Sequence, residues 1–225
     1  MTPPVPQGDH GARDYDLPDA ALLAPEGPAF ERLAWRPARL CVVIGRGNDP
    51  RLSVAAEAVA SRGIPVYRRP SGGEAVVLSP ATAVLSLVSR PDLRRPSREY
   101  FNRLNEAVRR ALEELGVGGV GTAGISDLEI GGRKICGSAL YRNRHLVFCH
   151  AVLNVAESPL TLEELLPMPG RMPDYRRGRP HRDFVTSLHA AGFPLPVETV
   201  VDALVKAVDN PGSAGRSPAG SPQAG

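Results

Sequence analysis

The stretch ISDLEIGGRKICGSALYR, residues 125–142, predicts a β-hairpin at the centre of the fold. Residues 125–130 alternate between apolar and polar side chains, which is typical of a half-buried strand. Gly131 and Gly132 supply a tight two-residue turn, and the next ten residues return as the paired strand. Because the turn aligns the two strands, we expect Asp127 and Lys134 to face one site.

Lys134 stands out in this hairpin because the chain otherwise uses arginine. Of the 27 lysine and arginine residues, only Lys134 and Lys206 are lysine. Lysine carries a compact ammonium with three rotatable donors, whereas arginine presents a planar fork. Lys206 lies near the end of a predicted helix, where a cation offsets the helix dipole. Two explanations of Lys134 stay open at this point, a functional ammonium and a residue that merely escaped an arginine-rich coding bias.

Further strands and helices are predicted on both sides of the hairpin from hydrophobic periodicity and from glycine and proline positions. They are short helical turns within 19–33, a buried strand at 40–45, a helix at 53–63, a strand, turn and strand at 64–79, a strand at 81–90, an amphipathic helix at 97–116, a strand at 145–155, a short helix at 157–167 and a last helix at 197–208. Residues 1–18 and 209–225 are rich in Pro and Gly and predict disordered tails. We therefore expect one domain over residues 19–208.

The turn within residues 64–79 suggests an anion site. Arg68 and Arg69 stand directly before Pro70, Ser71, Gly72 and Gly73, so guanidinium groups and backbone N–H groups converge on one loop. Such a loop can hold a phosphate or another anion. The alternative is a plain turn with two exposed arginines, and the loop alone does not decide between them.

The composition limits the classes of function. With 225 residues, of which 42% are hydrophobic, the chain can bury a core of its own. A net charge of +3 without a long basic run does not favour nucleic acid as the main partner. Cys41, Cys136 and Cys149 show no CxxC spacing, which disfavours a disulfide framework and a zinc site. No signal peptide or membrane span is recognisable, so we expect a cytoplasmic protein.

Five segments taken in order resemble the lipoate-protein ligase and octanoyltransferase family. They are VVIGRGNDP at 42–50, VYRRPSGGEAVVL at 66–78, the hairpin at 125–142, HLVFCHAVLNV at 145–155 and PHRDFVTSL at 180–188. The resemblance implies an α/β (α+β) domain whose mainly antiparallel central sheet is flanked by helices, as in biotin protein ligases and class II tRNA synthetases. It also implies an activity, in which ATP activates lipoate or octanoate to an acyl-adenylate that is passed to a lysine of a carrier domain.

The resemblance assigns roles to residues in three of these segments. Lys134 would lie between the acyl carbonyl and the α-phosphate, and Asp127 would help to hold Mg²⁺ and the nucleotide. The other residues implied in binding the acyl chain and the adenylate are Arg69, Ser71, Gly72, Gly73, Gly137, Ser138 and Ala139. The implied cofactors are ATP and Mg²⁺. The implied partners are the lipoyl carrier domain of a 2-oxoacid dehydrogenase or glycine cleavage protein, and a separate accessory subunit.

Departures from the family pattern keep two other functions open. Glu74 stands where the ligases usually have a third glycine, and a carboxylate beside a phosphate site is unfavourable. An ATP-independent octanoyl or lipoyl transferase would act through a cysteine thioester, with Cys149 as the alternative nucleophile. Cys149 also fits a buried strand cysteine without a catalytic role. A non-catalytic acyl-binding homologue is the third function.

Overall fold

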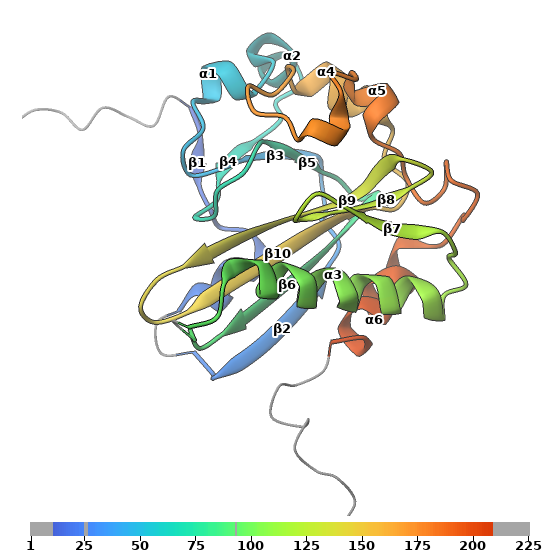
Figure 1. Ribbon diagram of the computed structural model, residues 1–225. Helices are drawn as coiled ribbons and strands as arrows, with labels where there is room; N and C mark the ends of the chain where they lie inside the picture. Colours follow the sequence, from blue (N-terminus) through green and yellow to red (C-terminus); the bar gives the residue numbers. More distant parts are fainter. Residues whose placement is uncertain (1–10, 25–26, 93, 209–225) are drawn as a thin grey trace, which may run out of the picture.

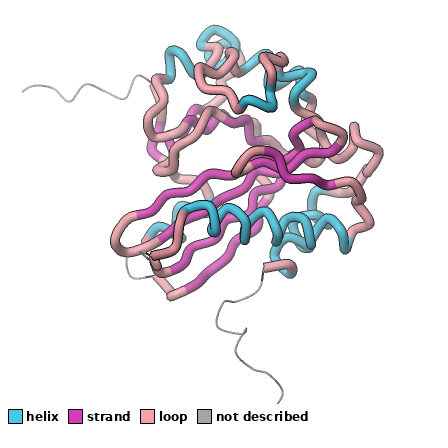
Figure 2. Tube along the Cα trace, viewed as in Figure 1, coloured by secondary structure: helices cyan, strands magenta, loops and turns pink. Residues whose placement is uncertain are grey.

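The computed structural model describes residues 11–24, 27–92 and 94–208, so residues 1–10 of the predicted N-terminal tail and the whole predicted tail at 209–225 lie outside the described residues. The described chain forms two β-sheets that lie face to face (Figures 1 and 2). Helices α3 and α6 cover the far side of the larger sheet, and the short helices α1, α2, α4 and α5 lie beyond the smaller sheet (Figure 1).

In chain order the elements are β1 (Arg13–Asp14), the 3₁₀ helix η1 (Pro18–Leu23), β2 (Phe30–Trp35), β3 (Cys41–Ile44), α1 (Pro50–Ser53), α2 (Ala56–Ser61), β4 (Val66–Arg68), β5 (Val76–Leu78), β6 (Thr82–Ser89), α3 (Ser97–Glu114), β7 (Val120–Ala123), β8 (Asp127–Ile130), β9 (Arg133–Arg142), β10 (Val147–Asn154), α4 (Pro159–Leu165), the 3₁₀ helix η2 (Asp174–Arg176), α5 (His181–Phe184) and α6 (Val197–Lys206).

The larger sheet has the strand order β2-β6-β10-β9-β8-β7, and all of its neighbouring strands are antiparallel. The predicted central hairpin is confirmed as β8 and β9. Gly131 and Gly132 between them have φ angles of 59° and 75°, which only glycine adopts at little cost. The prediction of a mainly antiparallel sheet flanked by helices is therefore confirmed.

The main hydrophobic core lies between the larger sheet and helices α3 and α6. Leu104, Val108 and Leu112 repeat at helical spacing on α3 and are fully buried against the sheet, as the amphipathic pattern predicts. Val200 and Leu204 of α6 complete the same core. One face of the larger sheet thus packs against α3 and α6 in the main core, and a binding site can form only on the opposite face.

The smaller sheet has the order β1-β4-β3-β5 and differs from the sequence prediction. Residues 64–79 do form two strands with a turn, but β3 lies between β4 and β5, so these two strands do not pair with each other. β3 pairs in parallel with β4 and antiparallel with β5. Pairing of this kind is non-local, so the local pattern does not reveal it.

Two N-terminal predictions were wrong. Residues 11–18 belong to the fold, because β1 pairs in parallel with β4 through Arg13 opposite Tyr67 and Asp14 opposite Arg68. The expected helical turns within 19–33 are limited to η1, and Phe30–Trp35 forms β2 at the edge of the larger sheet, paired with β6. In both places the exposed edge of another strand supplies backbone partners that the short segments could not provide by themselves.

Candidate active site

A cavity of about 880 Å³ lies between the two sheets. Its apolar wall includes Val43 of β3, Val77 of β5, Val84 of β6 and Val152 of β10. Its polar wall includes residues of the 69–74 loop, of the β8–β9 hairpin and of the loop before α5. A cavity of this size, with convergent polar groups at one part of an apolar wall, is the usual form of a small-molecule site.

Lys134 and Asp127 meet at this cavity. The Lys134 Nζ lies 3.0 Å from Asp127 Oδ1, and the exposed fractions of the two side chains are 28% and 10%. Asp127 also accepts hydrogen bonds from the hydroxyl of Tyr175 and, at 3.2 Å, from Ser126 Oγ. The prediction that Asp127 and Lys134 face one site is confirmed, and the carboxylate fixes the direction of the ammonium.

Tyr175 was missed by sequence reasoning. It lies in the Pro- and Arg-rich loop before α5, where no periodicity marks it, and its hydroxyl reaches Asp127 from 48 residues away in the chain. Burial and the neighbouring Asp127 raise the pKa of Tyr175, so the phenol keeps its proton and acts as a donor. The only signal in the sequence was an aromatic residue within a polar loop.

Gly137 forms the floor beneath the Lys134 ammonium. A Cβ atom at position 137 would lie 2.6 Å from Lys134 Nζ and 2.7 Å from Lys134 Cε. Only a residue without a side chain leaves the ammonium where it is. Gly137, Ser138 and Ala139 all line the cavity, and Ser138 Oγ donates to the Ser126 carbonyl at 2.8 Å, which ties β9 to the loop before β8.

The segment after α5 fixes the backbone of Lys134. Thr186 N–H donates to the Lys134 carbonyl at 2.9 Å, and Val185 forms an isolated parallel bridge with Lys134. The guanidinium of Arg133 donates to the Val185 carbonyl at 2.7 Å. The strand position of Lys134 is therefore held from two sides, by β8 and by residues 185–186.

Arg69 supports the 69–74 loop from inside. Its guanidinium donates to the carbonyls of Val43 at 3.1 Å, Gly72 at 2.7 Å and Glu74 at 2.8 Å, and the residue is 4% exposed. Burial lowers the pKa of Arg69 to about 10, against a smaller opposing effect of Tyr15 and Glu74. Arg69 borders the cavity, but most of its donors are directed at backbone carbonyls.

The residues after Arg69 divide between two roles. Ser71 is 1% exposed, does not line the cavity, and its hydroxyl lies 2.8 Å from His150 Nε2. Gly72, Gly73 and Glu74 line the cavity, and their backbone N–H groups have no hydrogen-bond partner among the described residues. These free donors are what an anionic ligand requires.

His150 is a second residue of the cavity that no sequence pattern marked. His150 lies on β10, is 7% exposed, lines the cavity and contacts Ser71; His181 is also buried. His150 stands within a nearly continuous apolar strand, and a single histidine in such a strand is more often a core residue than a functional one.

The structure does not support Cys149 as the alternative nucleophile. Cys149 precedes His150 on β10, so its side chain points to the opposite face of the sheet, into the core beneath α3. Burial raises the pKa of Cys149 and Cys136 to about 12, and that of Cys41 to about 11. A thiol with a raised pKa that is at most 4% exposed is a poor nucleophile near neutral pH.

The described residues do not form a ready metal site. Within residues 11–24, 27–92 and 94–208, no group of three or more His, Cys, Asp or Glu side chains could hold a metal ion. Both oxygens of Asp127 already accept hydrogen bonds, from Tyr175 on one side and Ser126 and Lys134 on the other. Magnesium is usually held by one or two carboxylates together with substrate phosphates, so Asp127 as a Mg²⁺ ligand stays a prediction. None of the described helices is long and apolar enough to cross a membrane.

Curated relatives of the chain are lipoate-protein ligases. It is 31% identical over 112 residues to lipoate-protein ligase LplJ of Bacillus subtilis (strain 168). The aligned region covers 50% of this chain and 33% of LplJ. It is 29% identical over 115 residues to lipoate-protein ligase 1 of Staphylococcus aureus (strain Mu50). The aligned region covers 51% of this chain and 34% of that protein. The matched part is thus about a third of the length of these relatives.

Solved structures share the fold. The putative lipoate-protein ligase Ta0514 of Thermoplasma acidophilum with bound lipoic acid has a TM-score of 0.66 at 22% identity, over 80% of this chain and 72% of that one. Lipoate-protein ligase A bound with ATP has a TM-score of 0.67 at 23% identity, with the same coverage. The profile of the lipoyl protein ligase A/B catalytic domain matches residues 31–209. Because that match spans well over half of the chain, the protein belongs to the lipoyl protein ligase A/B catalytic domain family.

Proposed function

We propose that this protein uses ATP to activate lipoate or octanoate to an acyl-adenylate and transfers the acyl group to a lysine of a carrier domain. The observation that carries the proposal is the Lys134 ammonium, held 3.0 Å from Asp127 above Gly137 in the wall of a cavity of about 880 Å³. The cavity offers an apolar surface for an acyl chain beside this one lysine.

The chemistry of acyl transfer suits a fixed ammonium. When the ε-amine of the carrier lysine attacks the acyl carbonyl, a C–N bond forms, the bond from the acyl carbon to the phosphate oxygen breaks, and the amine loses a proton. Negative charge builds up on the carbonyl oxygen and on the leaving phosphate. A preorganised donor directed at such charge lowers the barrier by about 3 to 4 kcal/mol. Asp127 and Tyr175 supply the preorganisation.

The 69–74 loop supports the binding of a phosphate. Gly72, Gly73 and Glu74 line the cavity, and their backbone N–H groups have no partner among the described residues. The carboxylate of Glu74 opposes an anion there. The buried Arg69 guanidinium attracts Glu74 and so offsets part of this negative charge, although burial lowers the pKa of Arg69 overall. We propose Gly72, Gly73, Lys134, Gly137, Ser138 and Ala139 as residues that contact the substrates, with Arg69 and Ser71 as supports of the loop.

The burial of the cysteines favours the ligase over a cysteine-dependent transferase. Cys41, Cys136 and Cys149 are the three cysteines of the chain, and all are buried with raised pKa values. A thioester intermediate needs an accessible thiolate. The ligase mechanism needs none. In this proposal the protein works in the reducing cytoplasm.

The proposed acceptor is the lipoyl domain of a 2-oxoacid dehydrogenase or the corresponding glycine cleavage protein. One solved structure with the same fold is described as a bi-partite lipoate-protein ligase with its E2 lipoyl domain, from Thermoplasma acidophilum, and it has a TM-score of 0.69 at 23% identity. That protein is the reason to include a separate accessory subunit in the proposal. The test below is therefore run with and without such a subunit.

The test incubates the purified chain with ATP, Mg²⁺, lipoate or octanoate and an apo lipoyl domain, and measures the mass of that domain. We expect an ATP-dependent mass gain of one acyl group, abolished in Lys134→Arg. A gain that needs octanoyl carrier protein and no ATP would instead identify a transferase. Binding of the acid without transfer, with and without an accessory subunit, would identify a non-catalytic homologue.

A further inference from the structure

A buried carboxylate lies behind the cavity, on a segment that the family match does not cover. Asp19 of η1 is fully buried, and the match begins at residue 31. Asp19 Oδ1 accepts a hydrogen bond of 2.8 Å from the Tyr15 hydroxyl, and Oδ2 accepts one of 2.6 Å from Ser86 Oγ on β6. A buried carboxylate with two dedicated donors is costly to keep unless it serves a further group.

That further group is His150. Its Nδ1 faces Asp19 Oδ2 at 3.8 Å, and its Nε2 lies 2.8 Å from Ser71 Oγ. Phe148 and Tyr15 enclose the imidazole, with ring centroids 4.9 Å and 6.4 Å away. The ring therefore has a carboxylate on one nitrogen, a hydroxyl on the other and aromatic rings around it, which leaves it no second orientation with the same partners.

The electrostatics select one tautomer. Burial and the nearby Arg69 lower the pKa of His150 despite the attraction of Asp19, so the ring carries one proton near neutral pH. Burial acts to raise the pKa of Asp19, but the interactions with His150, Ser86 and Tyr15 lower it overall, so the carboxyl is ionised. A bare Nδ1 would direct its lone pair at that carboxylate. The proton consequently belongs on Nδ1, and Nε2 accepts the hydroxyl proton of Ser71.

Ser71 passes this constraint on to the loop that borders the cavity. Its carbonyl accepts a hydrogen bond from Arg46 N–H at 2.9 Å, and its hydroxyl is engaged by His150. The next residues, Gly72 and Gly73, line the cavity. The contact between the Ser71 hydroxyl and His150 Nε2 therefore holds the start of this loop, and the tautomer of His150 decides whether Nε2 accepts or donates there.

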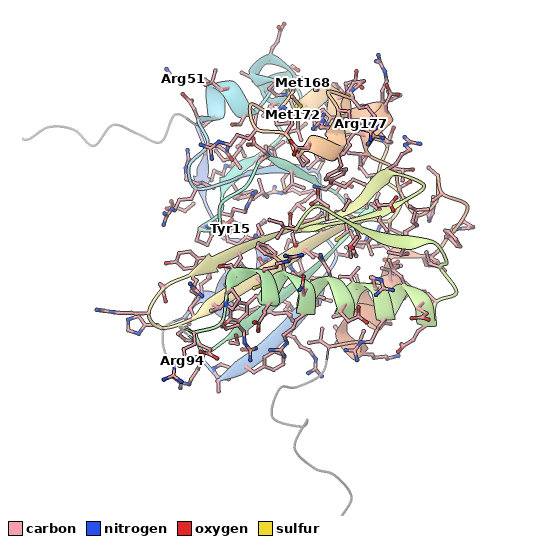
Figure 3. All side chains as sticks on the ribbon, in the orientation of Figure 1. Tyr15, Arg51, Arg94, Met168, Met172 and Arg177 are labelled. Atoms are coloured by element: carbon pink, nitrogen blue, oxygen red, sulfur yellow. The ribbon has the colours of Figure 1, made fainter. Side chains whose placement is uncertain are left out.

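We propose that Asp19 and Tyr15 are positioning residues that keep the His150 proton on Nδ1, and that His150 in turn holds the 69–74 loop through Ser71. Tyr15 lies at the side of the fold where the two sheets meet, and it also lines the cavity (Figure 3). The N-terminal segment is then part of the site, although it lies outside the matched domain. The positioning of His150 by Asp19 and Tyr15 does not depend on which reaction the protein catalyses, whereas its effect on catalysis rests on the proposed function.

The first experiment measures the tautomer directly, by two-bond ¹H–¹⁵N correlation NMR of the histidine rings in the full chain. The His150 signals are assigned by their loss in His150→Gln. We expect a neutral ring with the proton on Nδ1 in the wild type at pH 7, and an increased Nε2–H population in Asp19→Asn. A wild-type proton on Nε2, or a tautomer that is unchanged in Asp19→Asn, would overturn the proposal.

Two further variants separate positioning from folding. Asp16→Asn removes an exposed carboxylate of the same segment and should leave the His150 tautomer unchanged. Tyr15→Phe keeps the aromatic ring, removes one donor from Asp19, and should shift the tautomer in the same direction by a smaller amount. If Asp19→Asn does not fold, Tyr15→Phe provides the deciding measurement, and an unchanged tautomer there would count against the proposal.

The second experiment measures acyl transfer. Asp19→Asn should lower kcat/KM for lipoate or octanoate at least tenfold, while Asp16→Asn should stay at the wild-type value. Of the two carboxylates, only Asp19 faces His150, which contacts Ser71 of the loop. Equal values in the two variants would overturn the link to catalysis. If the wild type shows no transfer at all, the proposed function has failed, whereas the NMR result still decides whether Asp19 positions His150.

Discussion

The contact between Gly137 and Lys134 makes Gly137→Ala a sharp test of the proposed role of Lys134. A Cβ at position 137 would lie 2.6 Å from Lys134 Nζ and 2.7 Å from Cε, well inside ordinary contact distance. The end of a lysine side chain is flexible, so the ammonium gives way rather than the strand. To restore ordinary contact the ammonium must move by about 1 Å, and a displacement of that size can cost about a hundredfold in rate.

The fold should tolerate this substitution. Gly137 does not have a positive φ, so alanine can adopt its backbone conformation. Replacing glycine by alanine in a strand removes some freedom from the unfolded chain and stabilises by roughly 0.5–1 kcal/mol where no strain arises. We therefore expect a melting temperature at or above that of the wild type together with a large loss of activity, a combination that general destabilisation does not produce.

The assay compares kcat/KM for ATP-dependent transfer of lipoate to an apo lipoyl domain. Gly118→Ala is the matched control, because a Cβ there meets nothing within 4 Å and the φ is not positive. We expect Gly137→Ala to be about a hundredfold slower and Gly118→Ala to equal the wild type. Activity of Gly137→Ala within threefold of the wild type would refute the claim that the placement of the ammonium limits the reaction.

Three other substitutions probe the same site. Lys134→Arg should abolish transfer with the fold intact, because a planar fork cannot occupy the position of a compact ammonium above Gly137; turnover near the wild-type rate would contradict this. Tyr175→Phe removes a donor to Asp127 and should slow transfer about tenfold or more, the equivalent of about 1.5–3 kcal/mol for a hydrogen bond to a charged group; an unchanged kcat would show that Asp127 needs no such support. Cys149→Ser should retain transfer but unfold at a lower temperature, since it places a hydroxyl in the core. The native Cys149 thiol, with its pKa raised to about 12, should resist alkylation at pH 8. Loss of transfer in Cys149→Ser without loss of stability would support the thioester mechanism.

The sequence by itself predicted the elements whose partners are near in the chain. The hairpin of β8 and β9 could be predicted from alternation and two adjacent glycines, and α3 from its helical periodicity, because the interactions that form these elements span only a few residues. The meeting of Asp127 and Lys134 followed from that hairpin. The resemblance of the ordered segments to a family supplied the expected fold and the expected chemistry.

Only the tertiary structure decided which residues surround Lys134 and His150. Tyr175 reaches Asp127 from 48 residues away, and Asp19 lies 67 residues from Ser86 and still farther along the chain from His150. No local pattern encodes such contacts, since they depend on how separate elements pack. The orientation of Cys149 was decided in the same way. The nearly continuous apolar sequence of β10 allowed either face of the strand to point into the core. The packing of α3 against one face buried Cys149 and left His150 at the cavity.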